Sequence, residues 1–249
     1  MTIALGASRT WAVIALVTPP TVNNFGCGEN QAGNTLNIGT PNATVTAGDY
    51  LFLVISGIGS VQGAAGSTTV VTGITNGNGV CTAGSTCVWQ QVPNIATVYD
   101  NAGGRSDIWY AIAPMSGANG AGVMVNTSSG NTFVGACMFE VSGLAPSTVV
   151  DQSVATDVTA AATNLSSPEI LGNGQPELFL AVSSCANIGY QALAPFTPLD
   201  GVCIGAGCFP DGIGGCPGAY LIANGTGPQS VTLVQTPAGT GAVGIASTA

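Results

Sequence analysis

The sequence lacks histidine and lysine altogether, and its only basic residues are Arg9 and Arg105. Ser–His–Asp triads, Cys–His pairs, Schiff-base lysines, phosphate-binding P-loops and histidine-ligated zinc sites each require a residue type that is missing. Two arginines are also too few to neutralise a phosphate backbone. These catalytic and metal-binding classes are therefore excluded, and we expect no nucleic-acid partner.

Charge of either sign is scarce. Charged residues make up 5% of the 249 positions, against roughly 25% in an average soluble domain, and eleven acids leave a net charge of −9. Serine, threonine, asparagine and glycine hydrate a surface but do little to keep two molecules apart. The composition therefore favours a subunit whose surface meets copies of itself. With so few groups to titrate, we also expect stability to depend weakly on pH, without a steep loss between about pH 5 and 3.

Long hydrophobic runs are missing as well, although 46% of the residues are hydrophobic and the mean hydropathy is +0.46. The longest apolar stretch, Trp11–Val17, ends at Thr18 and two prolines, whereas a helix that spans a bilayer needs ~20 apolar residues. We therefore expect no membrane span. We interpret the stretch as a buried strand rather than as the apolar region of a signal peptide.

The sequence does contain a long succession of β-type segments. Short apolar runs rich in Val, Ile, Thr and aromatic residues alternate with Gly, Pro, Asn and Ser, and helical periodicity is absent. This pattern predicts an all-β fold, an antiparallel β-sandwich that resembles a jelly roll. The predicted strands are 12–17, 35–38, 42–46, 50–56, 88–92, 107–112, 122–126, 134–141, 149–155, 163–165, 178–183, 218–222, 230–234 and 241–246.

Two of these strands, 50–56 and 178–182, are apolar or small at every position, which predicts burial of both faces. Three Gly-rich inserts, 26–34, 57–86 and 186–216, each hold at least one cysteine and predict long loops. We find no exact internal repeat and no linker. The prediction is therefore a single β-sandwich domain over residues 12–249, preceded by an N-terminal arm over residues 1–11.

The eight cysteines favour disulfides over a metal site, because no C-x-x-C motif and no histidine is present. Disulfides imply an oxidising compartment or a particle outside the cell. Cys81 and Cys87, which flank a short loop, are the best single candidate pair. The full set of disulfide candidates is Cys27, Cys81, Cys87, Cys137, Cys185, Cys203, Cys208 and Cys216.

The order of several motifs resembles a β-sandwich domain of bacterial and phage-associated surface proteins. The motifs are TVTAGDYLFLVISG, VWQQV, SDIWYAIAP, VGACMFEVSGLAPSTVVDQSVAT, PELFLAVSS and the closing GAVGIASTA. The resemblance extends from Ala12 to the C-terminus, and it implies the fold and a surface location but no catalytic residue. The cysteine-bearing inserts and the loss of charge depart from the family's pattern. A weaker resemblance is to subunits of donor-strand, pilin-like filaments.

Several residues are candidates for a functional role, and each of them can also be explained as part of the structure. Asp100 and Asp107 bracket a Gly-Gly-Arg turn and are weak calcium candidates, but we favour a polar hairpin turn as their explanation. Asp200 and Asp211, each followed by glycine, are interpreted in the same way. We expect no metal and no cofactor.

Glu140 lies in an apolar strand and could form half of a glycosidase pair with Glu169 or Glu177, which requires two acids roughly 5–10 Å apart. We prefer a structural acid there, and we expect no enzymatic activity. Trp89, Trp109 and Tyr110 could form a sugar-binding platform, but aromatic residues in strands more often belong to the core. Four N-x-S/T sequons are candidates for glycosylation: Asn42, Asn126, Asn164 and Asn224.

Three functional hypotheses follow. The first is a structural subunit of an extracellular, pilus-like filament or of a virion-like particle, with copies of itself as the partner. In the filament, the uncharged segment Thr2, Ile3, Ala4 and Leu5 would add to the sheet edge of a neighbouring copy. The second is a cell-surface adhesin or carbohydrate-binding module. The third is a secreted hydrolase with paired carboxylates. We favour the filament because of the arm and the cysteines.

Overall fold

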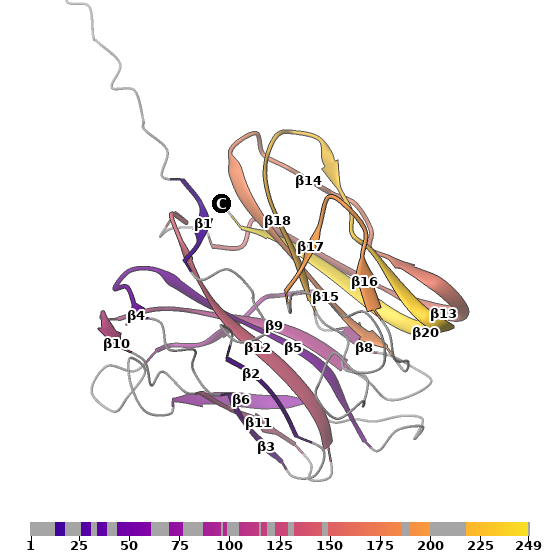
Figure 1. Cartoon of the computed structure of the whole chain (residues 1–249), viewed down its shortest axis with the longest axis horizontal. Coiled ribbons are helices and arrows are strands. Elements are labelled where there is room, and N and C mark those ends of the chain that lie inside the picture. Colours follow the sequence, from indigo (N-terminus) through magenta and orange to yellow (C-terminus); the bar gives the residue numbers. More distant parts are fainter. Residues whose placement is uncertain are drawn as a thin grey trace, which may run out of the picture.

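The computed structural model describes residues 13–17, 26–30, 34–38, 44–60, 70–76, 87–95, 97–98, 105–114, 116–118, 123–128, 132–145, 149–185, 190–199 and 218–248. All regular elements in these ranges are β-strands, and they pair in antiparallel fashion (Figure 1). The predicted all-β sandwich is therefore confirmed. No helix capable of crossing a membrane occurs in these ranges. The predicted arm, 1–11, lies outside them.

The first half of the described chain forms three sheets. Its strands are β1 (Ala15–Leu16), β2 (Gly26–Asn30), β3 (Thr35–Ile38), β4 (Thr44–Val45), β5 (Tyr50–Ser60), β6 (Val71–Asn76), β7 (Gln90–Gln91), β8 (Thr97–Val98), β9 (Arg105–Ile112), β10 (Gly117–Ala118), β11 (Val123–Thr127) and β12 (Thr132–Ser142). The first inner sheet has the order β1-β12-β5-β9-β7, with β2 also on β12 and β8 also on β9. The first outer sheet is β3-β11-β6, and β4 pairs with β10.

The second half contains fewer but longer strands. They are β13 (Gln152–Ser166), β14 (Ile170–Leu171), β15 (Pro176–Cys185), β16 (Tyr190–Ala192), β17 (Thr197–Pro198), β18 (Ala219–Asn224), β19 (Pro228–Gln229) and β20 (Thr232–Thr248). The second inner sheet has the order β13-β20-β15-β18-β17, and β14 pairs with β19. The end of β13 and the start of β20 pair with each other, and β16 adds to β20; we call this part the second outer sheet.

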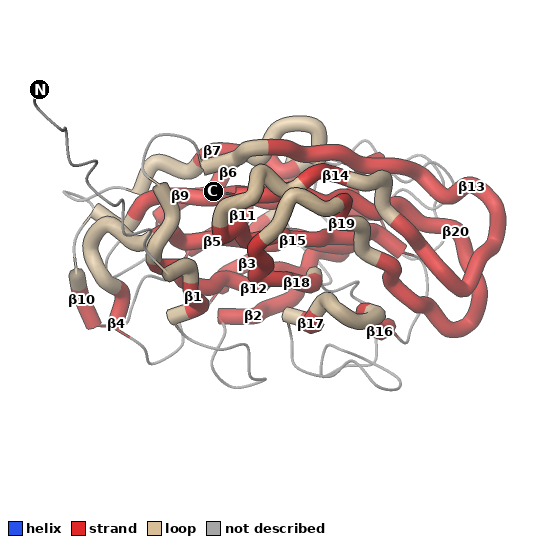
Figure 2. Tube along the Cα trace, turned by 90° about the horizontal axis from the view of Figure 1, so that it is seen from above, coloured by secondary structure: helices blue, strands red, loops and turns tan. Residues whose placement is uncertain are grey.

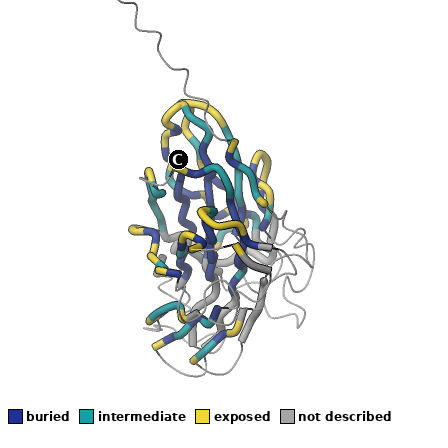
Figure 3. Tube along the Cα trace, turned by 90° about the vertical axis from the view of Figure 1, so that its left-hand side faces the viewer, coloured by how far each residue is buried: buried dark blue, intermediate teal, exposed yellow. Residues whose placement is uncertain are grey.

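Strand β5 explains how the layers stack. Along it, Tyr50, Phe52 and Val54 belong to the apolar layer between the two inner sheets. The alternate residues Leu51, Leu53 and Ile55 belong to the layer between the first inner and first outer sheets. All six are at most 3% exposed, so the predicted two-sided burial is confirmed. Figure 3 shows the buried residues along the middle of the packed strands and the exposed ones at the turns.

Strand β15 has the same character in the other half. Leu178, Leu180 and Val182 face the first inner sheet, whereas Phe179 and Ala181 belong to a third apolar layer. That third layer is closed by residues of the second outer sheet, such as Leu165 and Leu233. The molecule is thus built of four sheet layers with three apolar layers between them.

The two halves repeat one pattern of strand pairing. The order β1-β12-β5-β9-β7 corresponds to β13-β20-β15-β18-β17, and the pair β4·β10 corresponds to β14·β19. The outer sheets correspond too, with β6 in the place of β16. Even single hydrogen bonds match, because Val92 N donates to Ile108 O at 2.8 Å and Leu199 N donates to Gly218 O at 2.9 Å. No exact repeat is visible in the sequence, yet two sandwiches of like topology pack inner sheet to inner sheet.

Some boundaries differ from the predicted ones. The segments predicted as separate strands, 149–155 and 163–165, form one strand, β13, and 230–234 and 241–246 form β20 (Figure 2). Register shifts between Val158 and Asn164 let β13 bend from the inner sheet to the outer one. Parts of the predicted loops are strands as well, namely β2, the end of β5, β6, β16 and β17. Most of the remainder of those inserts lies outside the described residues.

Candidate functional site

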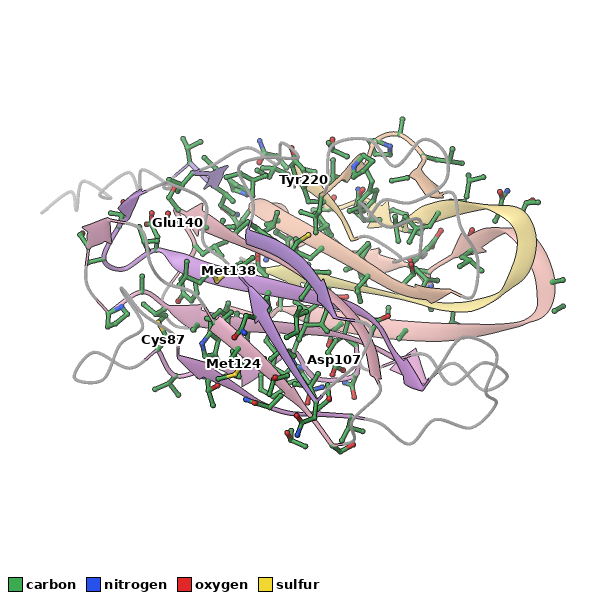
Figure 4. The ribbon with its side chains drawn as sticks, turned by 60° about the horizontal axis from the view of Figure 1, so that its bottom comes forward. Cys87, Asp107, Met124, Met138, Glu140 and Tyr220 are labelled. Carbon is green, nitrogen blue, oxygen red and sulfur yellow. The ribbon has the colours of Figure 1, made fainter. Side chains whose placement is uncertain are left out.

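The most unusual polar feature of the described chain is a pair of carboxyl groups at Glu140 and Asp49. Glu140 lies on β12 directly opposite Leu51 and is 3% exposed. Its Oε1 accepts a hydrogen bond from Thr46 N at 2.7 Å. Burial raises the pKa of Glu140 from 4.5 to about 7, the Thr46 bond opposes this, and Asp49 adds to it. Figure 4 shows where Glu140 lies on the ribbon.

A tight turn places both partners of Glu140. In the turn Thr46–Asp49, Asp49 N donates to Thr46 O at 3.2 Å and Gly48 has a φ of 89°. A glycine with positive φ at the third position defines a type II turn. Two further bonds tie the turn to the end of β9, since Gly48 N donates to Ala113 O and Ala113 N donates to Asp49 O. The turn therefore presents one N–H donor and one carboxyl group to the buried acid.

A second carboxyl pair lies in the other sandwich. Glu177, in β15, is fully buried, and its Oε2 accepts a hydrogen bond from Asn173 N at 3.0 Å. Burial raises its pKa, the Asn173 bond lowers it, and the charge of the exposed Asp151 raises it further. The Oε1 of Glu177 is buried without a hydrogen-bond partner. The preceding turn again contains a glycine of positive φ, Gly174 at 88°.

Asp49 and Glu177 occupy corresponding places in the two sandwiches, whereas Glu140 lies on β12 and Asp151 just before β13. Tyr50 and Leu178 are the first residues of β5 and β15 in the layer between the inner sheets, and Asp49 and Glu177 immediately precede them. In both sandwiches a backbone N–H of the turn before the central strand binds the buried carboxyl group. Each site therefore combines a buried glutamate that accepts a backbone N–H with an aspartate that is half-buried (Asp49) or exposed (Asp151).

These contacts differ from the pairing considered for a glycosidase. The acid that influences Glu140 is Asp49 and the one that influences Glu177 is Asp151, and Glu169 is exposed. Asp49 and Asp151 were not singled out from the sequence. The glycine-containing turn ahead of β5 is a local signal of the position of Asp49.

Of the four aspartates considered as calcium ligands, the structure describes Asp107. Asp107 is fully buried in β9, opposite Ile55 rather than in a turn, and its Oδ1 accepts a hydrogen bond from Gln91 Nε2 at 2.9 Å. Figure 4 marks its position. Asp100, Asp200 and Asp211 lie outside the described residues. Within the described ranges, no three acidic, histidine or cysteine side chains group as metal ligands would.

The candidate aromatic platform contributes to the core. Trp89 and Trp109 are half-buried against the apolar layer between the first inner and outer sheets. Tyr110 packs on the opposite side, with its ring centroid 6.2 Å from that of Phe52. Its hydroxyl donates to Gln90 Oε1 at 2.9 Å. The three rings therefore divide between two faces of one sheet and do not form a single row.

The remaining predicted positions are scattered. Of the sequons, Asn164 and Asn224 are exposed, whereas Asn126 Nδ2 donates to Thr75 Oγ1 at 3.1 Å within the first outer sheet. Asn42 and the arm residues Thr2, Ile3, Ala4 and Leu5 lie outside the described residues.

The cysteines are described in part. Cys87 and Cys137 have described side chains and are disulfide-bonded, and none of the cysteines in the described part is free. For Cys27 in β2 and Cys185 in β15 the structure describes the backbone. The predicted pair Cys81–Cys87 is not placed, because Cys81 lies outside the described residues, as do Cys203, Cys208 and Cys216.

Comparison with known proteins assigns the chain to no family. No protein-family model, no curated protein and no solved structure matches the chain. The resemblance to surface-protein sandwich domains therefore remains an expectation from the sequence motifs.

Proposed function

We propose that the protein is a structural subunit that assembles with copies of itself into an extracellular filament. The observation that carries this proposal is the near absence of surface charge. Asp107, Glu140 and Glu177 are buried, which leaves at most eight acids and two arginines for a surface of 10,752 Å². A free domain of this size usually devotes about a quarter of its surface residues to charge, which keeps molecules apart.

Exposed apolar side chains support the same proposal. The described surface exposes Val13 (81%), Val88 (69%), Leu171 (58%), Ile112 (44%), Leu193 (41%) and Val17 (39%). Val13 and Val17 flank β1, at one edge of the first inner sheet, and Val88 lies just before β7 at the other edge. Apolar groups at both edges of a sheet suit stacking of subunits edge to edge, because each contact removes them from water.

The N-terminal arm suggests how one subunit joins the next. The uncharged segment Thr2–Leu5 is β-capable, and a strand from one subunit can complete the sheet edge of the next, as in donor-strand filaments. A cell surface is the proposed location, with a virion as the alternative. Glycans on exposed Asn164 or Asn224 would add further hydration.

Disulfides complete the proposal. The register of β2 on β12 places Cys27 directly opposite Cys137, and Cys137 is disulfide-bonded. We propose a Cys27–Cys137 bridge across these two strands, since directly opposed residues have the Cα separation that a disulfide needs. Peptide mapping of the non-reduced protein by mass spectrometry tests it. A peptide linking 27 to 137 is expected, and Cys137 linked elsewhere contradicts it.

The test of function compares edge and arm variants by negative-stain electron microscopy. We expect Leu5→Asp and Val13→Asp each to abolish filaments, because a buried unpaired carboxylate opposes strand addition. Thr226→Asp, in an exposed turn, is the matched control and should assemble normally. Unchanged filaments in both edge and arm variants would contradict the proposed mode of assembly, and closed shells would replace the filament by the virion.

A further inference from the structure

One edge of the first inner sheet is built differently from the corresponding edge of the second. In the second sandwich a single strand, β13, pairs with β20 from Gln152 to Ser166, with shifts of register near its middle. In the first sandwich three separate strands take its place, because β1 and β2 pair with β12 and β3 pairs with β11. β1 is therefore a short, separate piece where the other sandwich has a continuous strand (Figure 1).

Few backbone contacts hold β1 at this edge. It pairs with the end of β12 over two residues, Ala15 and Leu16. In addition, Val17 N donates to Glu140 O at 3.1 Å, and the hydroxyl of Ser142 donates to Ala15 O at 3.4 Å. Since a hydrogen bond adds little net stability when water is the alternative partner, these bonds fix β1 only weakly.

The place that β1 occupies is nevertheless shaped for it. Ile14 is buried in the apolar layer between the inner sheets, and Leu16 packs against the same layer. Gly143, just after β12, lets the chain pass closely, because an added Cβ there would collide with the carbonyl group of Val13. Without β1 this end of the layer would lie open to water. Each subunit therefore needs a strand of this sequence here, from its own chain or from another.

The segment 13–17 is also suited to a contact between copies. It carries no charge, and its outward side chains Val13 and Val17 are 81% and 39% exposed. The eight residues 18–25 join Val17 to β2. A fully extended chain of that length spans about 26–29 Å. The connection is therefore long enough to carry β1 to an adjacent subunit.

We propose that β1 is exchanged between copies of the chain, so that residues 13–17 of one subunit lie on the end of β12 of the next. This inference rests on the proposed assembly and names its joint. The exchanged strand makes the same contacts that it makes within one chain, so none is lost. When each copy gives its strand to one neighbour and receives one from another, the contact is head-to-tail and the series of subunits stays open. The N-terminal arm precedes β1 and would go with it to the next subunit.

Two single-cysteine variants test the exchange. Ala15 and Ser142 lie directly opposite each other and are both half-buried, at a separation that a disulfide can bridge. Chains with Ala15→Cys and chains with Ser142→Cys are co-expressed, and the assembled material is oxidised and run on a gel without reductant. Since neither chain holds both new cysteines, a 15–142 bond must join two chains. We expect covalent pairs of chains, with that bond identified by mass spectrometry.

The control mixture replaces Ala15→Cys by Thr226→Cys, at an exposed position away from β12, and should give no 226–142 bond. Assembled material without any 15–142 bond between chains would overturn the exchange and leave the proposed filament standing. If the wild type does not assemble at all, the proposed function fails and the exchange fails with it.

A second measurement needs no variant to fold. Electron cryomicroscopy of wild-type filaments can trace the chain from Val17 to the start of β2 at Gly26. We expect this connection to run from one subunit to the next. A connection that stays within one subunit would contradict the exchange.

Discussion

At the level of single residues, Gly48 determines whether the turn before β5 can form. Gly48 adopts a φ of 89° in the turn that offers Thr46 N and Asp49 to Glu140. An added Cβ at Gly48 would meet nothing within 4 Å, so there is space for a side chain and the only obstacle is the backbone conformation. Glycine is therefore required for its freedom at positive φ.

We predict that Gly48→Ala lowers the free energy of unfolding by about 1 kcal/mol, the usual cost of positive φ for an L-residue. Urea unfolding measures it. Gly73→Ala is the matched control, because Gly73 also has open space around its Cβ but no positive φ. That variant should be neutral or slightly more stable. Equal losses in both variants would contradict the turn as described.

At the scale of the element, β5 is the strand on which two apolar layers depend. Phe52 is fully buried in the layer between the inner sheets and stacks on Phe139 at 5.7 Å between ring centroids. Leu53, the next residue, is fully buried in the layer toward the first outer sheet. A strand with one solvent face would tolerate truncation at one of the two.

We predict that Phe52→Ala costs about 3–5 kcal/mol and Leu53→Ala about 2–5 kcal/mol of unfolding free energy, because each leaves a cavity. Ile112→Ala on the neighbouring strand β9, where the side chain is 44% exposed, should cost less than either. Denaturant titration of the three variants checks this. A small loss at either buried position would mean that one face of β5 is not covered.

Features that depend on local composition can be predicted from the sequence alone. The strand 50–56 is apolar at nearly every position, and its two-sided burial follows from that alone. Strands β13 and β20 were predicted as broken, because small residues and glycines occupy their middles. In the structure those residues form the bends between inner and outer sheets, where bulges accommodate them.

The carboxyl pairs could not be predicted in the same way. Thr46 and Glu140 are 94 positions apart, so their contact depends on the pairing of β12 with β5. The repeat of the two sandwiches was hidden for a related reason. Tyr50-Leu-Phe-Leu-Val54 and Leu178-Phe-Leu-Ala-Val182 share alternation and burial, but the repeat lies in strand order and hydrogen bonds rather than in residue identity.

At the scale of the whole molecule, the two sandwiches share their central apolar layer. Fully buried residues from both halves, such as Phe52, Ile108, Leu178 and Leu180, form one cluster. Neither inner sheet can leave this layer without exposing it to water, which links the stability of one sandwich to that of the other.

We therefore predict a single cooperative unfolding transition in differential scanning calorimetry, with calorimetric and van't Hoff enthalpies in agreement. Leu180→Ala, which opens a cavity between the inner sheets, should lower the melting temperature of that one transition. Two separated transitions in the wild type would show that the sandwiches unfold independently.

We propose that a surface with so little charge is made for copies of the same chain. Multi-angle light scattering of the native protein tests it most directly, since it reports the mass of the particle in solution. We expect particles of many times the chain mass of 24.4 kDa, in the form of a polymer. A monodisperse species at the mass of one chain would contradict it.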